Sequence, residues 1–145
     1  MELLTKHSDD VSCFNTMKER DELLMDIRIE LELPIENSKS LEVFQSNTLR
    51  PLMKFQNILM LDIYKDYINR TQRSFSAFNQ KVQLEIIKDS VTKDQRLKNQ
   101  MIHIVVALFT IEEFNYYIKN LNELNKRIVS MTIQRLQDQL SRLIL

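Results

Sequence analysis

His103 is the side chain in the central and C-terminal sequence best suited to acid–base chemistry. Nucleophilic catalysis would require a Ser, Cys or second His held beside it, and local spacing places none there. The chain also lacks the HExxH pattern of zinc hydrolases and the Glu-x-x-His pattern of di-iron helical bundles. The sequence therefore predicts that His103 lies at the boundary of a buried face, and it indicates no catalytic residue, cofactor or metal ligand.

The composition argues against several classes of enzyme. The 145 residues include no glycine, and glycine is required where backbone closely approaches a phosphate, as in phosphate-binding loops and dinucleotide-binding fingerprints. The single cysteine, Cys13, allows neither an internal disulfide nor a zinc site made of cysteines. These features argue against an enzyme, but they do not identify an activity.

Four polar side chains lie where helical spacing predicts apolar faces. Gln56 sits among apolar neighbours in the segment Leu49–Ile68, and Asn125, Thr132 and Gln139 interrupt an apolar stripe near the C-terminus. A buried amide without a partner costs roughly 1–3 kcal/mol, so each should be hydrogen-bonded. Two interpretations stay open. In the first, these residues are exposed to solvent where the helix extends beyond the core. In the second, they form a buried polar network or an interface with a partner helix.

Charge is divided unevenly along a chain whose formal net charge is zero. Residues 1–47 carry 11 acidic and 5 basic side chains, a net of −6, and residues 48–145 carry 9 acidic and 15 basic, a net of +6. One interpretation is an acidic N-terminal arm lying against a basic core. The other is a basic face that binds an acidic partner such as nucleic acid, with Tyr116 and Tyr117 as stacking surfaces.

The segment Thr110–Leu145 predicts the longest helix. Thr110 and Glu113 have the spacing of a capping box, in which two side chains satisfy free backbone groups of the first turn. An apolar stripe follows at Phe114, Ile118, Leu121, Ile128, Leu136 and Leu143. An unbroken helix from Ile111 to Leu143 would measure about 50 Å, more than the ~35–40 Å width of a domain of this size. Either the helix bends near residues 120–122, or its end projects and is covered by a partner.

The remaining segments are interpreted as shorter helices. Leu49–Ile68 is apolar over most of its circumference, which is typical of a helix surrounded by others. The run Ile102–Phe109 is assigned to helix, although it would also suit a buried strand. Ile27–Leu33 alternates like a strand but has no partner strand, so a helix from Met17 toward Leu31 is preferred.

The sequence therefore predicts an all-α protein. The fold would be an antiparallel helical bundle of four core helices, with a long C-terminal helix and a less regular N-terminal helix. Residues 1–40 would form an acidic N-terminal arm containing that N-terminal helix, and residues 41–145 would form the bundle core. Because no apolar run reaches the ~18 residues needed to cross a bilayer, we expect a cytoplasmic protein without a membrane partner.

Three segments between Val43 and Leu140 resemble a known family. They read FQSNTLRPLMKFQN, FTIEEFNYYIKN and LNKRIVSMTIQRLQDQL. They are similar to a family of small all-helical bacterial proteins that often carry the label glyoxalase but lack the metal-ligand motifs of glyoxalases. The matching residues are Asn47, Thr48, Leu49, Arg50, Pro51, Lys54, Gln56, Asn57, Thr110, Glu113, Asn125, Lys126 and Arg127. The label implies turnover of methylglyoxal with glutathione when nickel or zinc is added.

These observations lead to three expectations of function. We expect first a non-enzymatic helical interaction or regulatory module that acts through a homo-oligomer, such as a homodimer, or through a helical protein partner. The alternative is a protein that binds nucleic acid or another polyanion through its basic core. A further alternative is an enzyme of the glyoxalase-labelled kind, acting by a mechanism that the sequence does not reveal.

Overall fold

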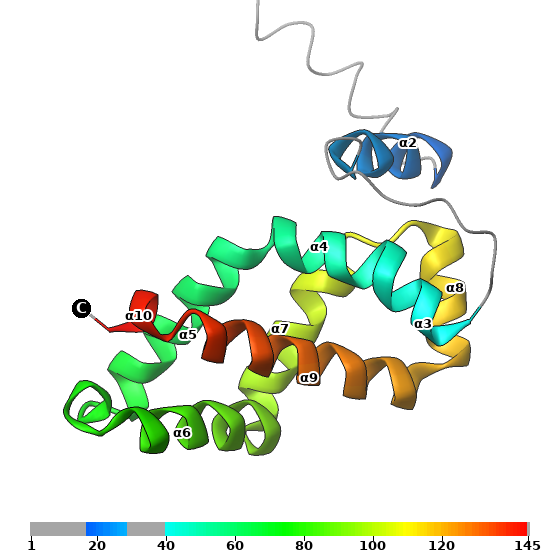
Figure 1. Ribbon diagram of the computed structural model, residues 1–145. Coiled ribbons are helices and arrows are strands. Elements are labelled where there is room, and N and C mark those ends of the chain that lie inside the picture. The colour runs from blue at the N-terminus through cyan, green and yellow to red at the C-terminus, as the bar shows by residue number, and fades with distance from the viewer. Residues whose placement is uncertain (1–16, 29–39, 145) are drawn as a thin grey trace, which may run out of the picture.

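The computed structural model describes residues 17–28 and 40–144 (Figure 1). The described secondary structure consists of helices alone, which confirms the predicted all-α class. The part of Ile27–Leu33 beyond Arg28 lies outside the described residues. The helices are α2 (Met17–Arg28), α3 (Leu41–Phe44), the π-helix η2 (Gln45–Leu49), α4 (Arg50–Phe55), α5 (Asn57–Thr71), the short 3-10 helix η3 (Phe75–Ala77), α6 (Gln80–Lys93), α7 (Gln95–Val106), α8 (Ile111–Lys119), α9 (Leu121–Asp138) and α10 (Leu140–Leu143).

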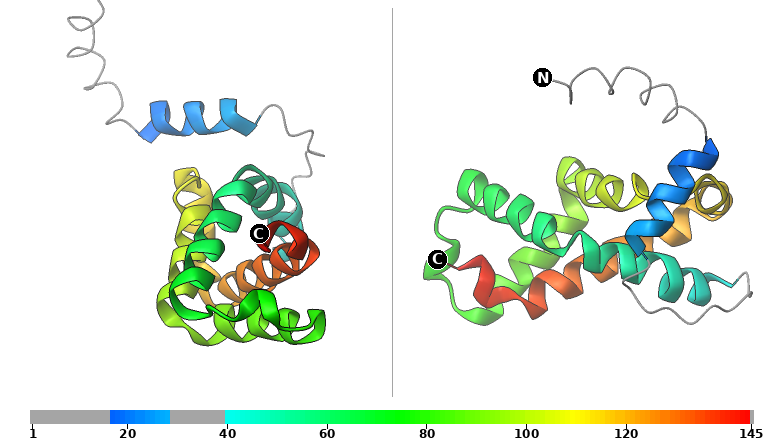
Figure 2. Two further views of the ribbon diagram at one scale, coloured as in Figure 1. Left: turned by 90° about the vertical axis from the view of Figure 1, so that its left-hand side faces the viewer. Right: turned by 90° about the horizontal axis from the view of Figure 1, so that it is seen from above.

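Helix α9 is the centre of the bundle. It lies between the α4–α5 segment and α6, with α7 behind it (Figure 1), and an end view shows the helices arranged around a common interior (Figure 2). Its side chains Leu124, Ile128 and Leu136 are completely buried. They share one apolar cluster with side chains of the neighbouring helices, namely Met53, Tyr64, Ile87, Val91, Met101 and Val105. Burial contributes roughly 1.5–3 kcal/mol for each large apolar side chain and holds the bundle together.

The helix predicted for Thr110–Leu145 is not continuous. Asn120 and Gln139 divide it into α8, α9 and α10, because their backbone angles leave the helical region (φ −126°, ψ 32° and φ −113°, ψ 29°). The Asn120 amide donates to the carbonyl oxygen of Tyr116 at 3.0 Å, a local hydrogen bond of the kind that competes with helix propagation. Of the two alternatives considered from the sequence, the chain adopts the bend near residues 120–122. The longest helix is α9, with 18 residues.

A second predicted helix, Leu49–Ile68, is interrupted at Gln56. Its backbone angles of φ −87° and ψ 6° separate α4 from α5. Most apolar side chains of this segment are buried, but Phe55, Ile58 and Leu59 are 51%, 71% and 44% exposed. The expectation that other helices surround the whole segment is therefore wrong at the α4–α5 junction. A helical wheel assumes one continuous axis, and the interruption at Gln56 turns these three residues outward.

The corner between α7 and α8 is closed by the predicted capping box. The Thr110 hydroxyl oxygen accepts from the backbone amide of Glu113 at 3.2 Å. In return, the Glu113 carboxylate accepts from the backbone amide of Thr110 at 2.9 Å. Helix α7 ends at Val106. The carbonyl groups of residues 107–109, between α7 and α8, need hydrogen-bond donors from elsewhere in the chain.

Helix α2 supplies those donors from outside the bundle (Figure 2). Arg20 and Arg28 donate to the carbonyl oxygens of residues 107–109 at distances of 2.5, 2.7 and 2.8 Å. Asp21 accepts from the first backbone amide of α8, that of Ile111, at 3.1 Å. The acidic N-terminal segment thus contributes a helix that is joined to the core through polar groups at a helix corner.

The most buried of these polar contacts is an ion pair between Arg28 and Glu113. The Arg28 Nη1 donates to Glu113 Oε2 at 2.6 Å, and the Thr48 hydroxyl donates to the same oxygen at 3.0 Å. The side chain of Arg28 is 4% exposed and that of Glu113 is 17% exposed. Three separate elements, α2, η2 and α8, therefore meet at one carboxylate.

Candidate functional site

Two of the four polar residues singled out in the sequence, Gln56 and Thr132, bond through their side chains only to backbone carbonyls of the described residues. Gln56 donates its amide to the carbonyl oxygen of Ile104 on α7 at 2.8 Å. Thr132, completely buried in α9, donates to the carbonyl oxygen of Ile128 one turn earlier at 2.8 Å. Both bonds satisfy polar groups that would be costly to bury without a partner.

The other two polar residues pair with side chains. The Tyr117 hydroxyl donates to the side-chain carbonyl oxygen of Asn125, which ties α8 to α9. The amides of Gln139 and Asn57 donate to each other at 2.7 and 2.8 Å, which ties the α9–α10 junction to the start of α5. The structure therefore places Gln56, Asn125, Thr132 and Gln139 at four different contacts and does not bring them together into one site.

The apolar stripe of the C-terminal segment is divided into a buried half and an exposed half. In its C-terminal half the stripe is buried, at Ile128, Leu136 and Leu143. In its N-terminal half it is 40%, 52% and 40% exposed, at Phe114, Ile118 and Leu121. The bend at Asn120 explains the difference, because α8 and α9 do not share an axis and one stripe cannot face one core. Phe114 and Ile118 of α8, together with Leu121 at the start of α9, are called the exposed α8 face below.

Aromatic contacts hold the other sides of α8. Tyr117 is buried and packs against Phe109 with ring centroids 5.5 Å apart. Tyr116 packs against Phe44 of α3 with centroids 4.8 Å apart. Burial raises the pKa of the Tyr117 hydroxyl, and its hydrogen bond to Asn125 lowers it to a smaller extent. Since these contacts fix α8 on the bundle, the exposed α8 face has a defined orientation.

Uncharged side chains border the exposed α8 face. At helical spacing, Asn115 falls beside Phe114 and Ile118 on α8, and Asn122 follows Leu121 in α9; both are exposed. The charged residues Glu112 and Lys119 lie further around the helix, where they line a hollow of about 520 Å³ between α8 and the α3–η2 segment. When an apolar face with neutral borders packs against an identical copy, no like charges are brought together. Placing like charges side by side in an interface would cost several kcal/mol.

A second, larger hollow lies between α6, α7 and α9. Its volume is about 710 Å³, and it is called the α6–α7–α9 groove below. Lys88, Lys98 and Lys126 line it, one from each helix. The other polar side chains of its lining are amides and hydroxyls, at Thr92, Gln95, Asn99, Asn122, Asn125, Ser130, Gln134 and Gln137. The lining contains no carboxylate and no arginine.

The groove has no recognisable signature in the sequence. Its three lysines come from separate helices, so they form no run that a reader of the sequence could recognise. The available signal was the excess of basic residues after residue 47, which indicates positive charge without locating it. Of the four polar residues singled out in the sequence, Asn125 alone is part of the lining. Lys126, which also lines it, was named only among the residues that carry the family resemblance.

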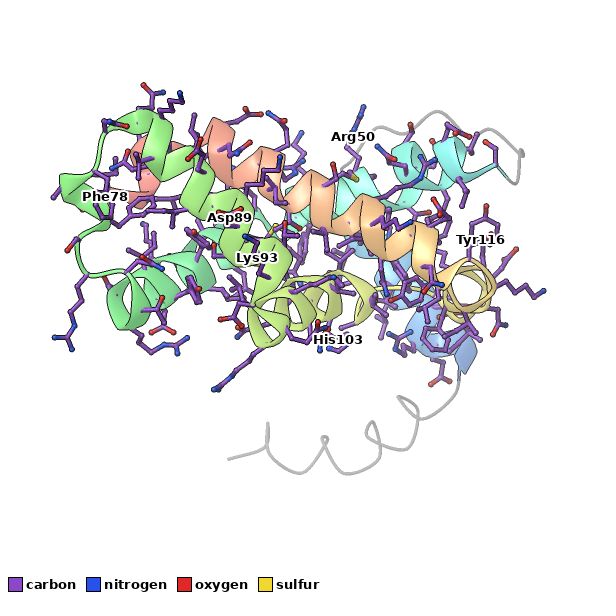
Figure 3. The ribbon with its side chains drawn as sticks, turned by 90° about the horizontal axis from the view of Figure 1, so that it is seen from below. Arg50, Phe78, Asp89, Lys93, His103 and Tyr116 are labelled. Carbon is purple, nitrogen blue, oxygen red and sulfur yellow. The ribbon has the colours of Figure 1, made fainter. Side chains whose placement is uncertain are left out.

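His103 does not lie at the boundary of a buried face, as its sequence position suggested. It is exposed on the outer side of α7 (Figure 3). Among residues 17–28 and 40–144, no three His, Cys, Asp or Glu side chains are grouped as a metal site would require. No helix in the described part of the chain combines the length and apolar character needed to cross a membrane. Comparisons with protein-family models, curated proteins and solved structures found no match to this chain.

Proposed function

We propose that this protein is a helical interaction module that forms a two-fold dimer through the exposed α8 face. The observation that carries the proposal is the exposure of Phe114 and Ile118 on one side of α8, next to Leu121 at the start of α9, while Tyr116 and Tyr117 pack α8 against the bundle. Exposed apolar residues scattered singly are common on protein surfaces. Apolar residues aligned on one helix face are more typical of an interaction surface.

A second copy of the chain is an occupant that suits this face. A two-fold axis that runs two α8 helices antiparallel would place Phe114 of one copy opposite Ile118 of the other. Ile111, which is only partly buried in the single chain, lies one turn before Phe114 on the same side of α8 and would extend this contact. Antiparallel helices also align their dipoles favourably. The uncharged borders at Asn115 and Asn122 leave no like charges in the contact.

Helix α2 provides additional apolar surface near α8. Its side chains Leu23, Met25 and Ile27 are 46%, 49% and 42% exposed, and Asp21 joins the helix to the first amide of α8. Because α8 has only nine residues, the surface area that it buries in a dimer is smaller than the roughly 800 Å² per partner of a standard interface. We therefore expect a dimer of modest affinity, with a dissociation constant on the order of 1 μM.

The experiment is the mass of the full chain in solution, measured by light scattering over a range of concentrations. The wild-type protein should pass from one chain to two as concentration rises. Ile118→Asp removes the burial of one apolar side chain per copy, about 1.5 kcal/mol each. The dimer contains this change twice, so its dissociation constant should rise about 100-fold.

Ile58→Asp is the matched control. Ile58 is 71% exposed on α5, so this variant introduces the same charge at an exposed isoleucine outside the α8 face. It should dimerise as the wild type does. A wild-type mass of one chain at every concentration would overturn the proposal, as would equal weakening by Ile118→Asp and Ile58→Asp.

A further inference from the structure

We propose that the α6–α7–α9 groove binds the sugar–phosphate backbone of a single-stranded nucleic acid. Lys88, Lys98 and Lys126 converge on it from three helices. Lys88 and Lys98 form no salt bridge with any described carboxylate, and Lys126 pairs with the exposed Glu123 at 3.6 Å. A hollow with positive charge and no acidic lining attracts polyanions, because each neutralised phosphate releases counterions.

The amides of the groove offer hydrogen-bond donors beside this charge. Asn125 uses its side-chain oxygen to accept from Tyr117, which leaves its NH2 group available. Asn99 likewise accepts from Gln95 at 3.0 Å through its oxygen, and its NH2 group remains available. Side-chain amides donate readily to phosphate oxygens and can also pair with exposed base edges.

The type of cation favours phosphate over carboxylate. Arginine is the side chain that matches a planar carboxylate with two parallel hydrogen bonds, whereas lysine binds phosphate as a compact point charge. All three cations of the groove are lysines. A nucleic acid is therefore a better ligand for this lining than an acidic peptide.

The dimensions of the groove favour a single strand of nucleic acid. Along α9 the groove extends from Asn122 to Gln137, about 22 Å at the rise of an α-helix. Its volume of about 710 Å³ falls in the ~300–1,000 Å³ range of sites for drug-sized ligands, which admits a few nucleotides of one strand. Ile102, Val129 and Ile133 are its apolar lining, and it contains no aromatic side chain for stacking. Binding should therefore depend on salt and tolerate changes of base sequence.

The test is fluorescence anisotropy of a labelled single-stranded RNA of mixed sequence, titrated with the full chain at several low salt concentrations. The triple variant Lys88→Gln, Lys98→Gln, Lys126→Gln should bind at least ~10-fold more weakly. Each lost phosphate contact reduces the salt slope by about 0.7, so the slope should become shallower by about 2. Asn125→Asp should also weaken binding, because it places a carboxylate in the groove while keeping the acceptor for Tyr117.

The control variant is Lys54→Gln, Lys65→Gln, Lys81→Gln, which changes the net charge equally at lysines outside the lining. It should retain most of the affinity, and circular dichroism should show that both triple variants keep their helices. Equal loss of affinity in both would overturn the proposal in favour of general charge attraction. Tighter binding of poly-glutamate than of RNA would show that the ligand is an acidic peptide and would overturn the proposal. Absence of RNA binding at low salt would overturn it as well.

Discussion

The bundle core and the contact of α2 with the α7–α8 corner are held together by different interactions. In the core, side chains such as Leu124, Ile128 and Met101 are completely buried among one another. At the corner, Arg20 and Arg28 donate to backbone carbonyls between α7 and α8, and Asp21 accepts from the first amide of α8. Apolar burial is non-directional, whereas these hydrogen bonds require particular atoms at particular distances.

This difference predicts different stabilities for the two regions. The core should unfold as one cooperative unit, because its apolar side chains all belong to one cluster. The α2 contact is smaller and polar, and one of its buried atoms, Arg28 Nε, has no hydrogen-bond partner. We therefore expect α2 to open separately, with a lower free energy than the core.

The largest effect should follow from a cavity in the core. Leu124→Ala removes a completely buried side chain of α9 and should lower the free energy of unfolding by about 3 kcal/mol. Urea denaturation monitored by circular dichroism measures this change. Ile58→Ala is the control, because Ile58 is 71% exposed and the loss should stay below ~0.5 kcal/mol. Similar losses in both variants would contradict the assigned core.

The core should also respond to alkaline pH through Tyr64. Burial raises the pKa of the Tyr64 hydroxyl from 10.0 to about 12, although a hydrogen bond from or to Ser90 at 2.8 Å opposes the shift. Because the folded-state pKa is the higher one, the stabilising contribution is complete below pH 10 and is lost as pH rises to about 12. A shift of this size corresponds to about 3 kcal/mol.

Tyr64→Phe separates this contribution from other alkaline titrations. The variant should lose about 1 kcal/mol at neutral pH, because one hydrogen bond is removed, and Ser90 keeps its contact with the carbonyl oxygen of Ile87 at 3.1 Å. It should then lose less stability than the wild type as the pH is raised. The free energy of unfolding of both proteins is measured by urea denaturation at each pH. If it falls equally in both as the pH is raised, Tyr64 is not buried as described.

Removal of Arg28 should release α2 and leave the core folded. Arg28→Gln removes charge-assisted bonds to Glu113 and to the carbonyl of Leu108, with a cost of about 2 kcal/mol to the α2 contact. Hydrogen exchange should show lost protection in residues 17–28 and unchanged protection in α9. Arg70→Gln is the control, since Arg70 pairs with Asp66 at an exposed site and should contribute only ~0.3–0.5 kcal/mol. Equal global destabilisation of α2 and α9 by Arg28→Gln would show that the two regions are one unit.

The smallest effect should come from the cap that both regions share. Thr110→Ala removes the hydroxyl that accepts from the Glu113 amide and should cost about 1 kcal/mol. The loss should appear in α8 and in the binding of α2, because Glu113 also accepts from Arg28. Ser40→Ala removes a cap of similar geometry at α3 and should leave hydrogen exchange in α2 unchanged. A loss of α2 protection in Ser40→Ala as large as in Thr110→Ala would contradict a role specific to the corner.

Local sequence patterns predicted helices better than they predicted where helices end. The capping box at Thr110 and Glu113 is present because both partners lie within one turn, so short-range spacing is sufficient. The interruptions at Gln56, Asn120 and Gln139 were not assigned as helix ends, with the exception of the bend considered near residues 120–122. Polar side chains occur inside many helices, and only their contacts show which ones terminate an element.

The candidate sites depended even more on tertiary contacts. The polar residues Asn125 and Gln139 were recognisable as exceptions on an apolar stripe, but their partners Tyr117 and Asn57 come from other helices. The exposed α8 face was part of that stripe and was read as core-facing, because the wheel extended the geometry of α9 through the bend. The lysines of the α6–α7–α9 groove had no local signal at all.

The all-helical class, the helix capped by Thr110, the acidic N-terminal segment and the basic remainder can all be predicted from the amino-acid sequence. These properties follow from composition and from interactions within one or two turns. The packed fold is needed to show which half of the C-terminal stripe is buried, which lysines share a groove and which carbonyls accept hydrogen bonds from the arginines of α2. Burial and hydrogen bonding of this kind depend on neighbours up to 90 residues away along the chain, and no local spacing specifies those neighbours.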